Sequence, residues 1–150
     1  MNDAPGVHRA GWSALDPGTL HDLLKLRVDV FVVEQECPYP ELDGRDVEPG
    51  TGHWWTADAG GAPTAYLRTL AEPDGTTRVG RVCTRADARG QGLAGELMRA
   101  VLAEAGTGPV VLEAQSYLEK WYSAFGFEVT GPEYVEDGIP HVPMRRPPSR

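Results

Sequence analysis

The strongest signal in the chain is a glycine-rich heptapeptide between a predicted strand and a predicted helix. It reads Arg89-Gly90-Gln91-Gly92-Leu93-Ala94-Gly95. Glycine lets the backbone approach a phosphate group closely, and successive N–H groups at the start of a helix form a cradle for anions. The dipole of the helix adds roughly half a positive charge at the same end. The heptapeptide therefore predicts a loop that binds an acidic cofactor.

The same glycines also match a competing pattern. Gly90, Gly92 and Gly95 spell G-x-G-x-x-G, the fingerprint of dinucleotide-binding domains. Glu113 ends the next predicted strand, near the place of a ribose-binding acid. In that fold the first glycine follows its strand almost at once, whereas here residues 85–89 intervene, roughly half the chain comes first, and too little follows for the usual parallel sheet. A dinucleotide-binding domain is therefore the weaker alternative, whereas a plain turn into a helix remains open, because a lone glycine pattern is not specific.

Hydrophobic periodicity on both sides of the heptapeptide predicts a mixture of strands and helices. The predicted strands cover residues 8–15, 53–59, 63–71, 77–84, 110–114, 127–130 and 141–145. The predicted helices cover residues 17–33, 93 to about 106, and 116–125, and a long polar loop covers 37–52. This order predicts one domain over residues 1–150, of the α/β (α+β) class, with a mixed, mostly antiparallel central sheet flanked by helices.

Composition and charge argue against several functional classes. A formal net charge of −8 without a basic cluster disfavours nucleic acid as a partner. No apolar run is long enough to span a membrane, and the N-terminus lacks the pattern of a secretory signal, so no membrane association is expected. Two cysteines in a domain of this size indicate a reducing compartment, which we take to be the cytoplasm. The four histidines are scattered without ligand spacing, so no metal site is predicted.

Two motifs in the expected order resemble the GNAT superfamily of N-acetyltransferases. Arg89-x-x-Gly92-x-Ala94 is similar to the R/Q-x-x-G-x-G/A loop with which that family binds pyrophosphate. Trp121-Tyr122-Ser123-Ala124-Phe125-Gly126-Phe127 is similar to the F-Y-x-x-x-G-F segment of the same family. Residues 28–46, together with Asp137-Gly138-Ile139-Pro140-His141, resemble the ElaA-like branch of the superfamily. The resemblance covers nearly the whole chain.

This resemblance implies an enzyme that moves an acetyl group from acetyl-CoA directly to a primary amine of a small molecule or peptide. By its place in this segment, Tyr122 matches the family's general acid. A phenol with its ordinary pKa of about 10 is protonated at neutral pH and can donate a proton; the alternative role of Tyr122 is that of a core aromatic. The thioester carbonyl is expected to meet a backbone N–H near Val82, Cys83 and Thr84, where Cys83 itself is interpreted as a packed thiol. The other residues implied to bind the cofactor are Arg89, Gly90, Gln91, Gly92, Leu93, Ala94 and Gln115.

The general base remains open at this level. The candidates are Glu34, His53, Glu113 and His141, each of which is also compatible with a purely structural role. A non-catalytic domain that binds acyl-CoA as a sensor is the alternative to an enzyme, and a homodimer is compatible with either.

The acceptor is predicted from a cluster of acids. Glu34 precedes the long loop, which carries Glu41, Asp43, Asp46 and Glu48. Such a cluster repels itself unless it is solvated or matched by a cation. We therefore expect a cationic amine acceptor in contact with Glu34, Asp46 and His141, with solvated surface as the alternative interpretation of these acids.

Overall fold

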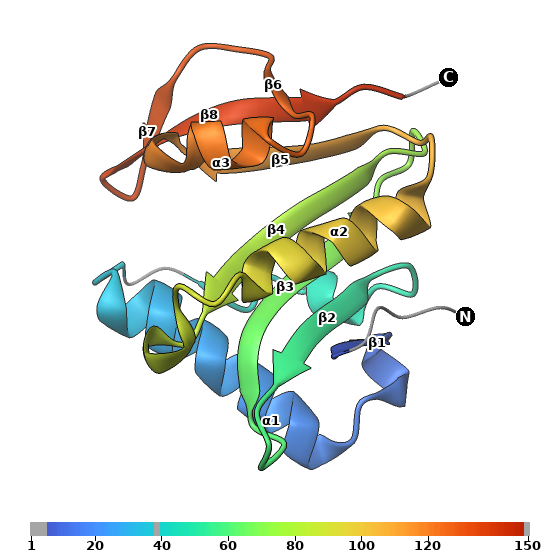
Figure 1. Cartoon of the computed structure of the whole chain (residues 1–150), viewed down its shortest axis with the longest axis vertical. Coiled ribbons are helices and arrows are strands. Elements are labelled where there is room, and N and C mark those ends of the chain that lie inside the picture. Colours follow the sequence, from blue (N-terminus) through green and yellow to red (C-terminus); the bar gives the residue numbers. More distant parts are fainter. Residues whose placement is uncertain (1–5, 38–39, 149–150) are drawn as a thin grey trace.

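The computed structural model describes residues 6–37 and 40–148. Within them, eight strands form one sheet in the order β1-β2-β3-β4-β5-β8-β6, with β7 paired to β8 (Figure 1). The strands are β1 (Val7–Ala10), β2 (Gly52–Ala57), β3 (Pro63–Ala71), β4 (Thr77–Thr84), β5 (Val110–Gln115), β6 (Glu128–Val129), β7 (Tyr134–Glu136) and β8 (Ile139–Arg146).

The helical elements are α1 (Pro17–Arg27), the π-helical segment Val28–Glu34 that continues it, α2 (Leu93–Ala105) and the short α3 (Glu119–Ser123). Single 3₁₀ turns cover Trp12–Ala14, Arg45–Val47, Ala86–Ala88 and Ser116–Leu118. The start of α1 follows from its sequence. Asp16 accepts a hydrogen bond from the Thr19 backbone N–H at 2.8 Å, and Pro17 occupies the first helical position.

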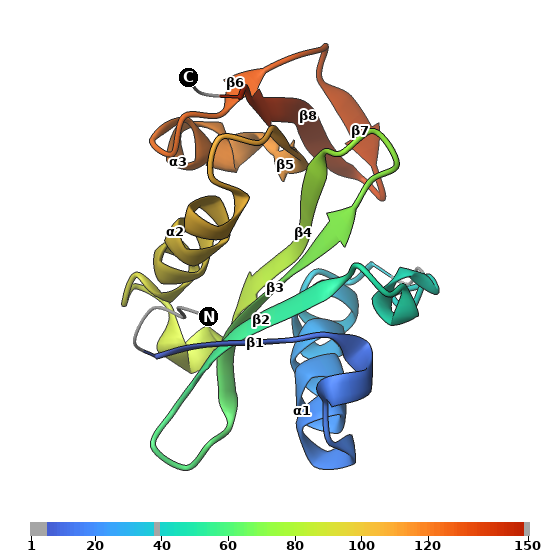
Figure 2. The ribbon, with the colours of Figure 1, turned by 90° about the vertical axis from the view of Figure 1, so that its right-hand side faces the viewer.

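Helices α1 and α2 cover opposite faces of the sheet (Figure 2). Because successive side chains of a strand point to opposite faces, β3 contributes to both halves of the core. Tyr66 packs in a cluster with Leu23 and Leu26 of α1. Leu67 packs in a second cluster with Leu97 of α2. Strand β3 therefore forms the buried centre of the molecule.

One pair of strands departs from the antiparallel pattern of the sheet. Strand β4 pairs with β5 in parallel, and only through Thr77 with Val110 and Arg78 with Val111. Every other strand pair within the described residues is antiparallel. Beyond Arg78 the two strands diverge and leave the sheet open (Figure 1). A mostly antiparallel sheet with one opening agrees with the predicted fold class and differs from the parallel sheet of dinucleotide-binding domains.

Several predicted boundaries hold and others are wrong. Residues 63–71 and 77–84 are strands as predicted, and α2 occupies the predicted range to within a residue. The strand predicted over 8–15 ends at Ala10, because its partner strand β2 begins at Gly52 and its pairing runs out at His53.

The helix predicted over 17–33 changes character at Val28. Residues 28–34, four of which are valines, follow a π-helical path instead, and β-branched residues have a slightly lower propensity for the α-helix. Strand β7 was not predicted, and α3 is shorter than the helix predicted over 116–125. No helix in the described part of the chain is long and apolar enough to cross a membrane.

Candidate active site

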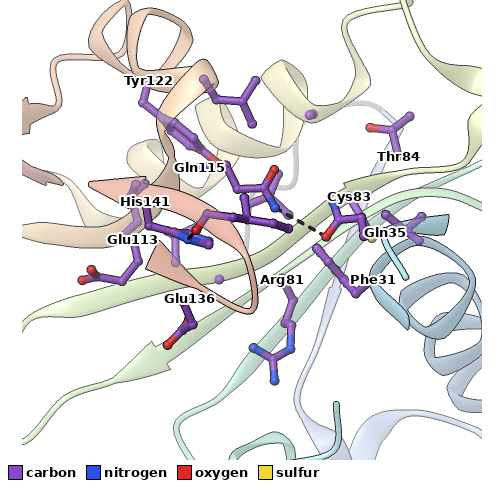
Figure 3. A pocket seen from close by; sticks show the side chains of 18 of the residues that line it. Phe31, Gln35, Arg81, Cys83, Thr84, Glu113, Gln115, Tyr122, Glu136 and His141 are labelled. Atoms are coloured by element: carbon purple, nitrogen blue, oxygen red, sulfur yellow. Dashed lines mark hydrogen bonds between the residues drawn. The ribbon is translucent and has the colours of Figure 1, made fainter. Parts of the chain in front are cut away.

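A cavity of about 560 Å³ occupies the opening between β4 and β5 (Figure 3). Strand β4 contributes its residues 79–84 to one wall, and β5 contributes Leu112, Glu113 and Gln115 to the other. Since the edge of β4 that faces β5 has no strand partner beyond Arg78, its backbone polar groups are available to a ligand there. This edge can therefore bind an extended, amide-containing molecule as an added strand would bind.

Strand β4 carries a bulge in the wall of this cavity. Tyr66 pairs with Cys83 and Arg68 pairs with Gly80, so Arg81 and Val82 together oppose one residue of β3. Arg81 has a φ of +55°, in the left-handed region that non-glycine residues rarely adopt. Bulges of this kind redirect a strand and are common next to functional sites. No signal in the sequence pointed to Arg81.

Most of the residues predicted to form the site line this one cavity. They are Glu34, Val82, Cys83, Thr84, Arg89, Ala94, Gln115, Tyr122 and His141. Gly90, Gln91, Gly92 and Leu93 lie beside it, in the loop that leads into α2. Gly90 and Gly92 have φ of +79° and +75°, and a side chain at either position would meet nothing within 4 Å. The glycine loop thus presents bare backbone to open space at the N-terminus of α2.

Tyr122 belongs both to the core and to the cavity. Its side chain is 5% exposed, and its ring makes edge contacts with Trp121 at 4.9 Å and Phe127 at 6.1 Å between centroids. The ring points into the pocket toward Gln115 (Figure 3). Burial raises the pKa of the phenol above its ordinary value, so Tyr122 keeps its proton at neutral pH. Such a group can donate a proton, and until it has done so it cannot act as a base.

Cys83 also lines the cavity but is not suited to nucleophilic chemistry. Burial raises the pKa of its thiol to about 12, whereas a reactive cysteine needs a stabilised thiolate. The thiol packs with Tyr66 and Leu26 in the smaller core cluster. This supports the interpretation of Cys83 as a packed thiol.

Glu34 and Arg89 form a bidentate ion pair at the mouth of the cavity. The two guanidinium nitrogens donate to the two carboxylate oxygens at 2.6 and 2.7 Å, and Arg89 Nε donates to the Thr84 carbonyl at 3.1 Å. Hydrogen bonding from Arg89 holds the pKa of Glu34 below its usual range. Glu34 therefore contacts the glycine loop rather than offering a free carboxylate.

The structure corrects the prediction for Asp46. Asp46 is 3% exposed, does not line the cavity and accepts hydrogen bonds from Arg27 at 2.8 Å and Arg68 at 3.2 Å. Burial alone would raise the pKa of Asp46, but these two arginines lower it below the ordinary value. Asp46 is thus neutralised inside the protein and is not available to an acceptor.

Glu41 and Asp43 are neutralised in the same way. Glu41 accepts from Arg27 Nε at 2.7 Å and from Arg81 Nε at 2.9 Å, and Asp43 accepts from Arg68 at 2.6 Å. The interpretation as solvated surface is therefore wrong for Glu41 and Asp46, and the predicted contact of Asp46 with the acceptor is wrong as well. The matching cations come from the chain itself. We call Arg27, Glu41, Asp43, Asp46, Arg68 and Arg81 the ion network.

The other candidates for the general base differ in their surroundings. His53 is buried outside the cavity, where its Nε2–H donates to the Asp46 carbonyl at 3.1 Å and its Nδ1 accepts from the Tyr66 hydroxyl at 2.7 Å. Burial lowers the pKa of His53. Glu113 accepts from the Tyr134 hydroxyl at 2.6 Å and from Arg78 at 3.4 Å. His141 lines the cavity and stacks on Tyr134.

Two acids of the cavity were not singled out from the sequence. Glu136 and Asp137 lie where β7 turns into β8, both line the cavity, and neither has an ion pair within residues 6–37 and 40–148. Asp137 and Gly138 have φ of +51° and +77°, as in the tight turn that an Asp-Gly pair favours. Among the described residues, no group of three or more histidine, cysteine or acidic side chains is arranged to hold a metal ion.

Comparison with known proteins places this geometry among acyltransferases. A family model described as the acetyltransferase (GNAT) domain matches residues 27–147. The chain is 52% identical over 138 residues to the UPF0039 protein Rv2851c of Mycobacterium tuberculosis, which covers 90% of this chain and 88% of that protein. It is 40% identical over 143 residues to the protein ElaA of Escherichia coli, which covers 89% and 91%.

Solved structures agree with these sequence relatives. An acyl-CoA N-acyltransferase from Pseudomonas aeruginosa superposes with a TM-score of 0.87 at 41% identity, over 93% of this chain and 97% of that one. The crystal structure of Escherichia coli ElaA also gives a TM-score of 0.87, at 35% identity and with the same coverage.

Proposed function

Because this chain belongs to the GNAT acetyltransferase family, in its ElaA-like branch, we propose that it transfers the acetyl group of acetyl-CoA directly to a primary amine. The acceptor amine belongs to a small molecule or to a peptide. The proposed compartment is the cytoplasm, because Cys37 and Cys83 are both free thiols.

One observation carries this proposal: the free edge of β4 and a protonated tyrosine line one cavity, and the bare glycine loop lies beside that cavity. The unpaired edge of β4 suits the amide groups of the pantetheine arm. The glycine loop, at the N-terminus of α2, suits the diphosphate. A backbone N–H between Val82 and Thr84, just after the bulge, would polarise the thioester carbonyl.

The chemistry then proceeds in one step without an acyl-enzyme. The amine nitrogen attacks the carbonyl carbon, the C–N bond forms, and the C–S bond breaks. The departing thiolate takes the proton of Tyr122, and the proton that the nitrogen loses as the amide forms restores Tyr122. The buried thiol of Cys83 has no part in this step, because its raised pKa keeps it neutral.

We further propose that the acceptor is cationic. Glu136 and Asp137 line the cavity, are exposed, and have no arginine or lysine partner among the described residues. In contrast, the acids of the ion network are already paired with its arginines and are not available to a cationic acceptor. The acidic character of the whole chain, with a net charge of −8, would also attract a cation.

The direct test is release of free CoA from acetyl-CoA by purified protein with a panel of cationic, neutral and acidic amines at low salt. We expect release with cationic amines, weaker at high salt because exposed charges are screened within about 8 Å at physiological ionic strength. Preference for an acidic amine would overturn the cationic acceptor alone. Binding of acetyl-CoA without release in the whole panel would favour the sensor alternative.

Cofactor binding has its own test in Gly92→Asp. Acetyl-CoA at about 100 times its Kd should stabilise the protein by about 2.7 kcal/mol, which is about 5 to 10 °C for a chain of this size. Gly92→Asp should abolish this shift, because an aspartate at φ +75° strains the loop and repels phosphate. Gly75→Asp is the matched control, since Gly75 also has positive φ and open space but lies in the β3–β4 turn. Stabilisation by NAD but not by acetyl-CoA would overturn the assignment.

A further inference from the structure

The proposed reaction leaves one proton without a destination. An alkylamine is an ammonium ion at neutral pH, and its nitrogen has no lone pair with which to attack the thioester. A group in the cavity therefore has to take that proton before the C–N bond can form. Tyr122 cannot do so, because it is itself protonated.

Hydrogen bonding removes three of the four candidates for this base that the sequence offered, and the two acids of the cavity that are unpaired among the described residues, Glu136 and Asp137, are proposed above to hold the ammonium ion itself. Both ring nitrogens of His53 are engaged in hydrogen bonds in the core, and the residue does not line the cavity. Both carboxylate oxygens of Glu34 are bound by Arg89. Both carboxylate oxygens of Glu113 are also occupied, one by the Tyr134 hydroxyl and the other by Arg78.

His141 differs because one of its ring nitrogens is fixed and the other is free. Its Nδ1 lies 2.7 Å from the Ile139 carbonyl oxygen. A carbonyl can only accept a hydrogen bond, so Nδ1 carries the proton of the neutral ring and Nε2 carries the lone pair. Within residues 6–37 and 40–148, Nε2 has no hydrogen-bond partner.

The orientation of this ring is also defined. The imidazole stacks on the ring of Tyr134, with centroids 5.7 Å apart and 19° between the planes. Tyr134 is in turn held by its hydrogen bond to Glu113. His141 pairs with Gln115 across β5 and β8, and its ring points into the pocket on the same side as Gln115 and Tyr122 (Figure 3).

From this arrangement we infer that His141 is the general base of the acetyl transfer. This inference rests on the proposed function. The ammonium proton moves to Nε2, giving an imidazolium ion that stays hydrogen-bonded to Ile139, and then passes to solvent. The freed lone pair forms the C–N bond while the C–S bond breaks and Tyr122 protonates the thiolate. The second proton, lost from nitrogen as the amide forms, returns to Tyr122, so one proton is released per turnover.

The test uses two amines of nearly the same shape. Ethylamine is an ammonium ion at pH 7.5, whereas 2,2,2-trifluoroethylamine is neutral and needs no base to free its lone pair. With ethylamine, His141→Gln should lower kcat about 100-fold or more, in the range typical of general base catalysis. With trifluoroethylamine, the same variant should keep kcat within about threefold of the wild type. The affinity for acetyl-CoA should be unchanged in either case.

His8→Gln is the matched control, because His8 also stacks on an aromatic ring, Trp55, at 5.3 Å and 20°, but lies outside the cavity. It should keep full activity with both amines. Free imidazole should restore part of the ethylamine rate of His141→Ala, which repacking of a merely structural histidine would not explain.

The outcomes separate this inference from the function on which it rests. A wild-type protein that releases no CoA with either amine would overturn both. If the wild type is active but His141→Gln lowers kcat equally for both amines, or for neither, the role of His141 alone is overturned. The same holds if long-range ¹H–¹⁵N NMR of histidine-labelled protein shows neutral His141 protonated at Nε2.

Discussion

At the scale of single residues, Tyr122 has two roles: its ring packs in the core, and its hydroxyl is proposed to donate a proton. Tyr122→Phe keeps the ring and its contacts with Trp121 and Phe127, so the melting temperature and the affinity for acetyl-CoA should be unchanged. Loss of the hydroxyl should lower kcat roughly 10²- to 10⁴-fold, the usual contribution of general acid catalysis. Steady-state kinetics beside a thermal melt provides the measurement. Normal turnover would leave Tyr122 as a core aromatic only.

Glu34 is the residue whose expected role changed most. Its carboxylate binds Arg89 of the glycine loop, close to where the proposed diphosphate would lie. Glu34→Gln should therefore lower the KM for acetyl-CoA about two- to fivefold, because it removes a negative charge that would repel the phosphates and leaves the Arg89 guanidinium free to bind them. Stability should change by less than about 1 kcal/mol, since both side chains are largely exposed.

Glu36→Gln is the control for this prediction, because it makes the same charge change at an exposed acid outside the cavity. It should leave the KM for acetyl-CoA unaltered. A Glu34→Gln variant in which only the KM for the amine rises would return Glu34 to the acceptor site.

At the scale of elements, the bulge in β4 depends on a strained residue. Arg81 keeps φ at +55° while its guanidinium is tied to the Glu41 carboxylate at 2.9 Å and the Glu41 carbonyl at 3.0 Å. The loop around residue 41 thus holds the strand in the shape that presents Val82 and Thr84 to the cavity. Without that tie, an ordinary side chain would favour a flat strand, whereas glycine tolerates positive φ.

Two substitutions at this position separate backbone shape from charge. Arg81→Ala and Arg81→Gly both remove the ion pair, but only glycine relieves the strain. Arg81→Gly should therefore be about 1 kcal/mol more stable than Arg81→Ala in urea unfolding, and its kcat should be several-fold higher. Equal kcat and equal stability in the two variants would show that the bulge does not depend on the tie to Glu41.

At the scale of the whole molecule, the ion network ties α1, the 41–46 loop, β3 and β4 together. Its three arginines and three acids are mutually neutralised, and Arg27 at its centre is fully buried. Removing one member of a buried pair is costly, because it leaves the other charge without a partner. The network is therefore expected to dominate the response of the fold to acid.

Stability should fall steeply on acidification. Hydrogen bonding from Arg68 lowers the pKa of Asp43, and Arg27 and Arg68 lower that of Asp46 despite its burial. An aspartate with a depressed folded-state pKa contributes stability above its unfolded pKa of about 4, and that contribution is lost as pH falls toward the folded-state pKa. Urea unfolding between pH 6 and 2 should show the loss below about pH 4. Asp43→Asn should have a lower free energy of unfolding at pH 7, and that free energy should fall less steeply on acidification than in the wild type. An equally steep fall in the variant would contradict this prediction.

Local patterns in the sequence were sufficient to predict several secondary-structure elements and the family of this protein. The periodicity of residues 63–71, 77–84 and 93–105 predicted β3, β4 and α2, because a strand or helix that packs on one face repeats its apolar residues within a few positions. The glycine loop and the segment around Tyr122 indicated the family because each is contained within one element and its turn, so that its residues are close together in the sequence.

Only the tertiary structure decided how the charges pair. Arg27 meets Glu41 and Asp46 across 14 and 19 residues of sequence, and Arg89 meets Glu34 across 55. Whether an acid in a loop faces water, substrate or an arginine depends on which elements the fold brings beside it, and this arrangement cannot be predicted from composition. The opening between β4 and β5 has the same origin, because strand separation is a property of the whole sheet rather than of either strand.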